Sequence, residues 1–420
     1  MPSSRYPDST SPQPSTPTLR IAVVVSHLPR NDNGGAERQA ERAALELARR
    51  GHDVSMFVRG RAARCYQRDG ISIVERPELR LSRASYASVS ALRFSWDVAY
   101  GVAAVARTRG RFDAVLTYHT FDAGFVGTAA SLATHTPQVL WIRSEQEYRS
   151  THLARGRLLA PLVWLASQTI LVQTPTIAAE FSLAASRLLP PCLATRVKRK
   201  VQVMANGLDV PNNTSPPAGT RDILFVGRLH RWKGLEYVIQ ALPMIPSASL
   251  TIVGEGPDRP RLERLAAGQP VTFVGPKSHD ELANYYRRAD LLVLASTFGE
   301  GLPNVVLEAM ASGRPVVATR TAGVVDVVRD GINGVLVEPG DASALAGALG
   351  SLLADSRCLL QLGAGARETA GGYTWDVIIP RLAAVLLAAS TSRQRWPGLL
   401  RRRLVRPDLR RSGKQRGAVP

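Results

Sequence analysis

The chain has 420 residues, of which 45% are hydrophobic and 21% are charged, a balance typical of a folded protein rather than a disordered one. Its length predicts about two or three domains. No apolar run reaches the roughly 18–20 residues that a membrane span needs. The three cysteines are far apart and fit neither a metal site nor a disulfide framework, so we expect a cytoplasmic protein.

Much of the net charge of +19 lies at the C-terminus, because residues 391–420 hold ten basic residues against one acidic residue. Such an excess attracts anionic lipid, nucleic acid or acidic substrates without distinguishing them. Apolar residues lie among these arginines, so one hypothesis is that the tail binds an anionic membrane surface as a short amphipathic segment. The protein would then associate peripherally with the inner face of the membrane. A solvated, disordered tail is the alternative.

Along the chain, strand-like and helix-like patterns alternate. Residues 1–18 are rich in Pro, Ser and Thr and predict a disordered leader rather than a signal peptide. A buried strand at 21–25, an amphipathic helix at 36–50 and a strand at 54–58 form a βαβ unit. Further strands are expected at 114–118, 138–142, 170–172 and 201–204, with a helix at 123–133. Residues 75–106 show no clear period.

A Pro/Asn/Ser/Gly-rich linker at 211–219 interrupts this alternation, which then restarts. Strands are expected at 223–226, 249–253, 271–274, 290–295, 315–319 and 334–337, and helices at 235–242, 259–267, 279–288, 303–313 and 342–354. The simplest interpretation of this alternation is an α/β fold with two doubly wound parallel-sheet domains. We expect a leader (1–18), a first domain (19–210), a linker (211–220), a second domain (221–375), a C-terminal helix (376–390) and a disordered basic tail (391–420).

The most informative stretch is 296–315, which joins two apolar strands through a glycine-rich turn and a short helix. Pro303 suits the first turn of that helix and Gly313 suits its end. A helix that opens behind such a turn directs unpaired N–H groups at a ligand, and this predicts an anion site. Glu300 precedes the helix and Glu308 lies inside it. A carboxylate there could bind a ribose diol, although both could instead complement the helix dipole.

Two basic residues flank another strand-to-helix corner of the second domain. Arg228 follows the strand at 223–226, and Lys233 precedes the next helix. A guanidinium and an ammonium at one corner can clamp a diphosphate. Ordinary surface charge is the alternative. In the first domain, the pair Gly34 and Gly35 opens the first helix and His119 ends a strand, where a plain turn and a structural histidine are the alternatives.

Together these motifs resemble those of glycosyltransferase family 4. The resemblance covers about residues 19–385 and is carried by the segments 34–38, 119, 206–209, 227–234, 254–256 and 300–311. It implies a retaining enzyme of the GT-B fold, in which two Rossmann-like domains face each other across a cleft. The second domain would bind a nucleotide-sugar donor and the first an acceptor.

The resemblance also implies roles for individual residues. Arg228 and Lys233 would hold the donor diphosphate, Glu308 the ribose and Glu300 the transferred sugar, and His119 would lie near the anomeric carbon. The catalytic set is therefore His119, Glu300, Arg228 and Lys233. Further donor contacts are expected from Gly34, Gly35, Gly301, Leu302, Pro303, Asn304 and Val305. The nucleotide-sugar is a substrate, and no cofactor or metal is expected.

Two segments depart from the family pattern. The loop at 321–326 has one glycine and an aspartate instead of a glycine pair and a glutamate, and Gln173 replaces a serine. The favoured function is hexosyl transfer from a UDP- or GDP-sugar to a glycan or lipid-linked acceptor in cell-envelope polysaccharide or glycolipid biosynthesis. A sugar-nucleotide epimerase of the same architecture, or a basic nucleic-acid- or membrane-binding scaffold without transferase activity, are the alternatives. No nucleic-acid motif is present.

Overall fold

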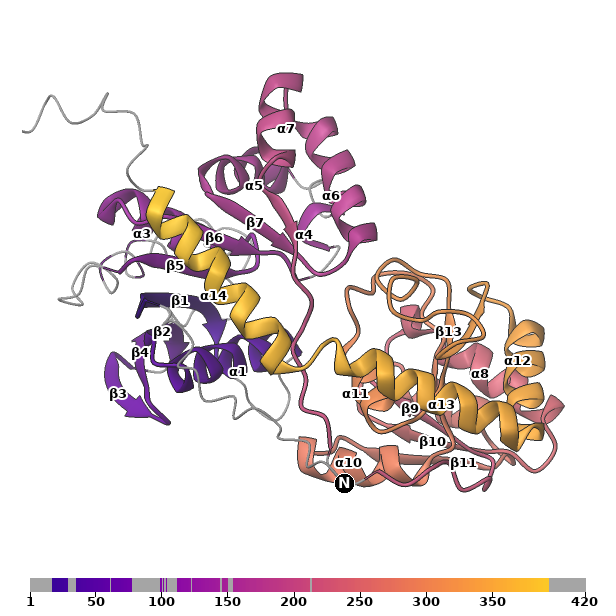
Figure 1. The fold of residues 1–420 in the computed structure, drawn as a ribbon. Coiled ribbons are helices and arrows are strands. Elements are labelled where there is room, and N and C mark those ends of the chain that lie inside the picture. The colour runs from indigo at the N-terminus through magenta and orange to yellow at the C-terminus, as the bar shows by residue number, and fades with distance from the viewer. Residues whose placement is uncertain are drawn as a thin grey trace, which may run out of the picture.

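The computed structural model describes residues 17–28, 35–60, 62–77, 99, 101, 103, 112–121, 123–143, 146–149, 154–211 and 214–392. The predictions for Gly34, for nearly all of the leader and for the tail beyond residue 392 lie outside these residues. Two α/β bodies lie side by side, one formed by the purple half of the chain and one by the orange half (Figure 1). The predicted pair of doubly wound domains is confirmed.

The first sheet, as far as the structure describes it, has eight strands in the order β3-β4-β2-β1-β5-β6-β7-β8. All neighbours are parallel except the hairpin of β3 and β4 at one edge. The strands are β1 (Arg20–His27), β2 (Asp53–Gly60), β3 (Arg64–Arg68), β4 (Ile71–Pro77), β5 (Ala114–Tyr118), β6 (Gln138–Trp141), β7 (Thr169–Val172) and β8 (Val201–Val203).

Helices cover both faces of this sheet, as parallel strands require. They are α1 (Gly35–Arg49), α3 (Ala123–Thr134), α4 (Gln146–Arg149), α5 (Ala154–Ala166), α6 (Pro175–Leu188) and α7 (Pro191–Lys198). In α1, the small and apolar residues at helical spacing are buried against the sheet, and the charged residues other than Glu46 are at least partly exposed. The hairpin strands β3 and β4 were not predicted from the sequence.

The second sheet has six strands among the described residues, all parallel, in the order β11-β10-β9-β12-β13-β14. They are β9 (Asp222–Val226), β10 (Ser249–Val253), β11 (Val271–Gly275), β12 (Leu291–Leu294), β13 (Val316–Thr319) and β14 (Gly334–Val337). The helices are α8 (Leu235–Ala241), α9 (Arg259–Leu265), α10 (His279–Arg288), α11 (Asn304–Ala311), α12 (Ala342–Ala354) and α13 (Ser356–Gly371), with short 3₁₀ turns η3 (Arg231–Lys233) and η4 (Leu242–Met244).

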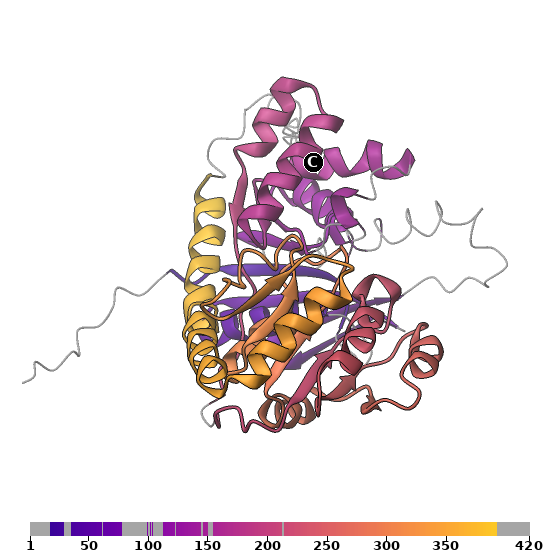
Figure 2. The ribbon, with the colours of Figure 1, turned by 90° about the vertical axis from the view of Figure 1, so that its right-hand side faces the viewer.

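The last helix, α14 (Trp375–Thr391), returns to the first domain and lies along it in both views (Figures 1 and 2). Its apolar face belongs to the same buried core as α1 and the strands β1, β2, β5 and β6. The segment that leads into α14 also pairs with the segment that leaves β8, because Leu208 forms a bridge with Thr374. The two crossings between the domains therefore run together.

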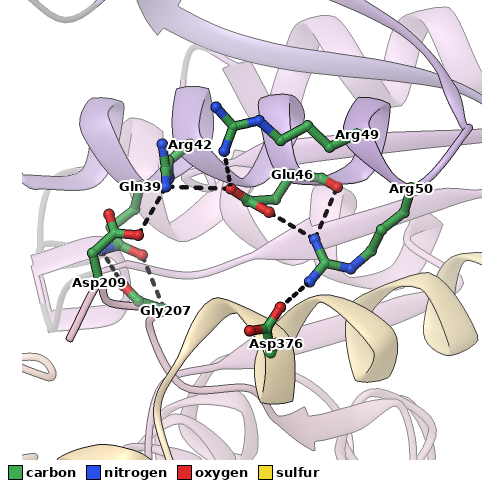
Figure 3. Close-up of polar contacts among 8 residues, drawn as sticks. All are labelled: Gln39, Arg42, Glu46, Arg49, Arg50, Gly207, Asp209 and Asp376. Atoms are coloured by element: carbon green, nitrogen blue, oxygen red, sulfur yellow. Dashed lines mark hydrogen bonds and ion pairs between the residues drawn. The ribbon is translucent and has the colours of Figure 1, made fainter. Parts of the chain in front are cut away.

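Polar contacts from α1 hold both crossings in place (Figure 3). Gln39 exchanges two hydrogen bonds with the backbone of Gly207, at 2.8 and 3.2 Å. Arg42 pairs with Asp209 at 2.8 Å, and Arg50 pairs with Asp376 of α14 at 2.6 Å. Glu46 is buried and accepts hydrogen bonds from Arg49 and Arg50, both at 2.7 Å. These contacts anchor both crossings on the first domain.

The domain boundaries at 210, 221 and 375 stay predictions. Among the described residues, none of the helices has both the length and the apolar character needed to cross a membrane.

Candidate active site

The predicted anion-binding loop has the expected local structure. α11 begins at Asn304 with Pro303 in the preceding, extended position, and Gly313 follows the helix end with φ of 71°. Pro303 thus lies one residue before the first turn rather than inside it, a difference within the usual uncertainty of helix ends. Leu302 and Pro303 are buried, whereas Asn304 and Val305 are half-buried.

Lys233 and Glu300, which the sequence assigned to different parts of a donor, contact each other directly. The Lys233 Nζ lies 2.5 Å from Glu300 Oε1, and Ser296 Oγ donates to the same carboxylate oxygen. Glu300 is only 5% exposed. The ammonium also lies 4.2 Å from the ring centroid of Trp232, a cation–π geometry. The two residues therefore form one buried ion pair at the carboxyl edge of the second sheet.

A glycine brings these two loops together. Gly234 has φ of 63°, and a Cβ at that position would overlap the backbone oxygen of Ala295 at the end of β12. Only glycine allows both this conformation and this approach. The loop that carries Lys233 therefore packs directly against the strand that leads to Glu300.

Arg228 lies on the same loop, but its side chain is exposed and forms no hydrogen bond or ion pair with any described residue. A Cβ at Gly256 would overlap the Leu229 backbone, so the turn after β10 supports this loop. Because no contact joins Arg228 to Lys233, the diphosphate clamp stays a prediction.

Glu308 has a partner that the sequence did not indicate. Tyr286 of α10 donates its hydroxyl to Glu308 Oε2 at 2.8 Å. Burial raises the pKa of Tyr286 far above its usual value, and the Glu308 carboxylate raises it further. The tyrosine therefore stays protonated and holds the carboxylate in one orientation. A tyrosine in an amphipathic helix gives no sign of this contact, so sequence reasoning could not have found it.

His119 directly follows β5 and has φ of 72°, a conformation that non-glycine residues rarely adopt. Its Nδ1 lies 2.8 Å from Oε1 of Glu147, a buried residue on α4. The backbone N–H groups of Thr120 and Arg143 donate to the same carboxylate, each at 2.6 Å. Local strain at a residue held by a buried carboxylate is a pattern that functional sites often show.

The His119–Glu147 pair changes both pKa values. Burial alone lowers the pKa of His119, but the Glu147 carboxylate outweighs burial, so the pKa lies above its usual value, with Glu37 adding to the rise. Burial alone raises the pKa of Glu147, but His119 and two backbone N–H groups leave it below its usual value. The pair therefore favours an imidazolium beside a carboxylate. Glu147 was missed from the sequence.

The carboxyl ends of the two sheets face each other through direct contacts. Asn206, which follows β8, donates its Nδ2 to the backbone oxygen of Leu302 at 3.0 Å and to Asn304 Oδ1 at 2.5 Å. A Cβ at Gly35 would lie 2.5 Å from Asn304 Nδ2, so the start of α1 also meets the start of α11. Gly301 meets Gln173, because a Cβ there would overlap the Gln173 amide oxygen.

The two departures from the family pattern both lie at this junction. The Gln173 Nε2 donates to Asn206 Oδ1 at 3.0 Å. Asp326 accepts hydrogen bonds from the backbone N–H and the hydroxyl of Thr176, at the start of α6, both at 3.0 Å. Asp326 therefore joins the two domains directly, whereas Gln173 binds Asn206 within the first domain, and Asn206 in turn binds Leu302 of the second.

The arrangement brings a helix N-terminus, a buried ammonium–carboxylate pair and an imidazole–carboxylate pair to facing sheet edges. N–H groups and cations can stabilise a developing negative charge. Carboxylates can accept hydrogen bonds from hydroxyl groups or stabilise a developing positive charge. No group of three or more potential metal-ligating side chains occurs among the described residues. Metal independence nevertheless stays a prediction.

Two doubly wound domains with facing strand ends define the GT-B architecture, and solved structures agree. Sucrose-phosphate synthase from Thermosynechococcus elongatus superposes with a TM-score of 0.74 at 23% identity, over 89% of this chain and 100% of that one. Anabaena Alr3699/HepE, solved in complex with UDP-glucose, has a TM-score of 0.68 at 19% identity, over 88% of this chain and 100% of that one. At these identities the likeness shows the fold alone.

Sequence relatives identify the family. Residues 33–210 match "Glycosyltransferase Family 4" and residues 220–355 match "Glycosyl transferases group 1". A D-inositol 3-phosphate glycosyltransferase of Salinispora arenicola is 30% identical over 319 residues, which cover 67% of this chain and 70% of that protein. Sulfoquinovosyl transferase SQD2 of Arabidopsis thaliana is 37% identical over 156 residues, only 36% of this chain and 30% of the relative. The chain belongs to glycosyltransferase family 4 and is a glycosyltransferase.

Proposed function

We propose that this glycosyltransferase transfers a hexose from a UDP- or GDP-sugar to a glycan or lipid-linked acceptor with retention of configuration and without a metal ion. Cell-envelope polysaccharide or glycolipid biosynthesis is the expected setting. The observation that carries the proposal is the Lys233–Glu300 pair beside the N-terminus of α11, at the edge that contacts the first domain.

The departing nucleoside diphosphate needs positive charge. An ammonium has three N–H donors, so Lys233 can keep its bond to Glu300 and still donate to phosphate oxygens. The N–H groups at the start of α11 add a second source of positive potential. One such donor is typically worth about 3–4 kcal/mol in a closed site. In this proposal the exposed Arg228 completes the diphosphate site when the donor binds.

The sugar-facing roles follow from the remaining groups. Glu300 accepts hydrogen bonds from hydroxyl groups of the transferred sugar, and Glu308, oriented by Tyr286, binds the ribose. His119, held through Nδ1 by Glu147, presents its other ring nitrogen to the sugar near the anomeric carbon. Same-face attack by the acceptor, assisted by the departing phosphate, accounts for retention.

The test is a panel of UDP-, GDP- and ADP-sugars screened by thermal shift, followed by turnover measurements with each donor that binds. The Anabaena complex suggests UDP-glucose as the first donor, and the Salinispora relative suggests D-inositol 3-phosphate as the first acceptor. We expect stabilisation by a UDP- or GDP-sugar and release of its nucleoside diphosphate. Stabilisation by none of the panel contradicts the proposal.

We further propose that the basic tail binds anionic membrane surface and so brings the enzyme to a lipid-linked acceptor. The support is the composition of residues 391–420, in which apolar residues lie among the arginines. Sedimentation with anionic liposomes compares the full chain with a 1–390 truncation. We expect only the full chain to sediment, and equal binding removes the role of the tail.

A further inference from the structure

Arg143, two residues after the end of β6, carries a buried guanidinium that has no hydrogen-bond acceptor among the described residues. The residue is 7% exposed, and its Nε and Nη1 are fully buried without a partner. Burial lowers the pKa of Arg143 to about 10, so the group stays charged at neutral pH. A buried cation without a hydrogen-bonded partner is costly, and such a group in a native fold calls for a ligand or another compensation.

Two aromatic rings hold this guanidinium. Its central carbon lies 4.9 Å from the ring centroid of Trp141 and 5.7 Å from that of Tyr118. Tyr118 and Trp141 are paired in register on adjacent strands, and Arg143 follows Trp141 by two residues. Trp141 Nε1 and the Tyr118 hydroxyl are likewise buried and have no hydrogen-bond partner in the part of the chain that the structure describes. Three neighbouring side chains thus have N–H or O–H groups to donate, and such groups bind negatively charged oxygen atoms.

Arg143 also lies where the two domains meet. Its backbone oxygen would be 3.0 Å from a Cβ at Gly301, in the loop before α11. Its backbone N–H donates to Glu147, the partner of His119. The carboxylates of Glu147 and Glu37 help to keep the guanidinium charged, but neither forms a hydrogen bond with it.

We propose that Arg143 binds a negatively charged group, a phosphate, carboxylate or sulfonate, carried by one of the two substrates. Trp141 and Tyr118 hold the guanidinium plane, so that its fork of N–H groups can meet two oxygen atoms at once. The inference rests on the proposed sugar transfer and narrows its substrate class. The charged group belongs either to the transferred sugar or to the acceptor, and the experiment separates these sources.

The experiment is isothermal titration calorimetry in two arms. The donor arm compares UDP-glucose with UDP-glucuronic acid, or GDP-mannose with GDP-mannuronic acid if only guanosine nucleotides bind. The acceptor arm compares myo-inositol with D-inositol 3-phosphate in the presence of the nucleoside diphosphate. The variants are Arg143→Gln and Arg143→Lys. Arg196→Gln, at an exposed arginine of α7, is the control for a simple loss of one charge.

We expect the wild type to bind the charged member of one arm at least tenfold more tightly than the neutral member. Arg143→Gln should lose this preference and bind the neutral member as the wild type does, while Arg196→Gln keeps the preference. If Arg143→Gln does not fold, Arg143→Lys provides the test instead. Lysine keeps the positive charge but cannot bind two oxygen atoms at once, so the preference of Arg143→Lys for the charged ligand should be at least threefold smaller than that of the wild type.

A wild type without preference in either arm overturns the inference, as does a preference that survives in the variants at Arg143. A wild type that binds no nucleotide-sugar at all contradicts the proposed function itself, and the inference falls with it.

Discussion

Replacing Lys233 by alanine should affect catalysis and stability through the same ion pair. Lys233 and Glu300 lie 2.5 Å apart, with side chains only 12% and 7% exposed. Loss of one preorganised cation from the leaving-group site should lower kcat by roughly 10²–10³-fold. Loss of one partner of a buried pair should also lower the free energy of unfolding by about 3–5 kcal/mol, because Glu300 then stays buried with Ser296 as its only side-chain donor among the described residues.

The double variant Lys233→Ala/Glu300→Gln separates the two effects. A neutral amide can still accept from Ser296, so most of the lost stability should return, whereas kcat should stay at least as low as in Lys233→Ala. Nucleoside diphosphate release measures activity, and urea unfolding measures stability. Lys277→Ala, at a surface pair with Glu281, is the matched control and should change neither. Transfer near the wild-type rate from Lys233→Ala, or from the double variant, refutes the reasoning.

Three further variants test other parts of the site. Gly301→Ala should lower transfer, because its Cβ would overlap the Gln173 amide oxygen and lie 3.0 Å from the Arg143 backbone oxygen, so the loop would have to shift away from the facing domain. The control Gly347→Ala has nothing within 4 Å and should remain fully active; equal activities contradict this. Tyr286→Phe removes a hydrogen bond to a carboxylate and should weaken donor binding by roughly tenfold in calorimetry; unchanged affinity contradicts an orienting role. Glu147→Gln should lower the free energy of unfolding most between the ordinary pKa values of Glu147 and His119, 4.5 and 6.5. Because the pKa of Glu147 is lowered, its contribution to the free energy of unfolding is lost as pH falls. Because the pKa of His119 is raised, its contribution to the same free energy is lost as pH rises. If urea unfolding shows the same destabilisation by Glu147→Gln at every pH, the charged pair is contradicted.

The fold was largely predictable because parallel strands buried on both faces appear as continuous apolar runs separated by amphipathic helices. The predicted helix at 279–288 matches α10, and the predicted helix at 342–354 matches α12. The β3–β4 hairpin was missed because β3, at the sheet edge, has no buried residue, and β4 buries only Ile71, Ile73 and Arg76, too few apolar positions for a continuous apolar run. The predicted helix at 376–390 is α14, but its apolar pattern could not tell which domain it covers.

The parts of the candidate site that depend on local backbone structure could be predicted from the sequence. The parts that depend on contacts between distant residues could not. A glycine and a proline around α11 indicate the helix from sequence alone, and the predicted anion site rests on that helix. The hydrogen-bond and ion-pair partners of the charged side chains are residues far away in the sequence. Glu147 reaches His119 across 28 residues, and Lys233 reaches Glu300 across 67. No local sequence pattern predicts such pairs. The sequence therefore indicated most of the charged residues of the site but not which of them contact each other.

The most direct test of the central proposal is proton NMR of one reaction, recorded in EDTA with an α-linked nucleotide-sugar that binds and its acceptor. The account predicts release of the nucleoside diphosphate and a first-formed product with the α configuration. A β-configured first product contradicts retention, and a reaction that stops in EDTA contradicts metal independence. Conversion of the donor into an epimeric nucleotide-sugar, without transfer, contradicts the account as a whole.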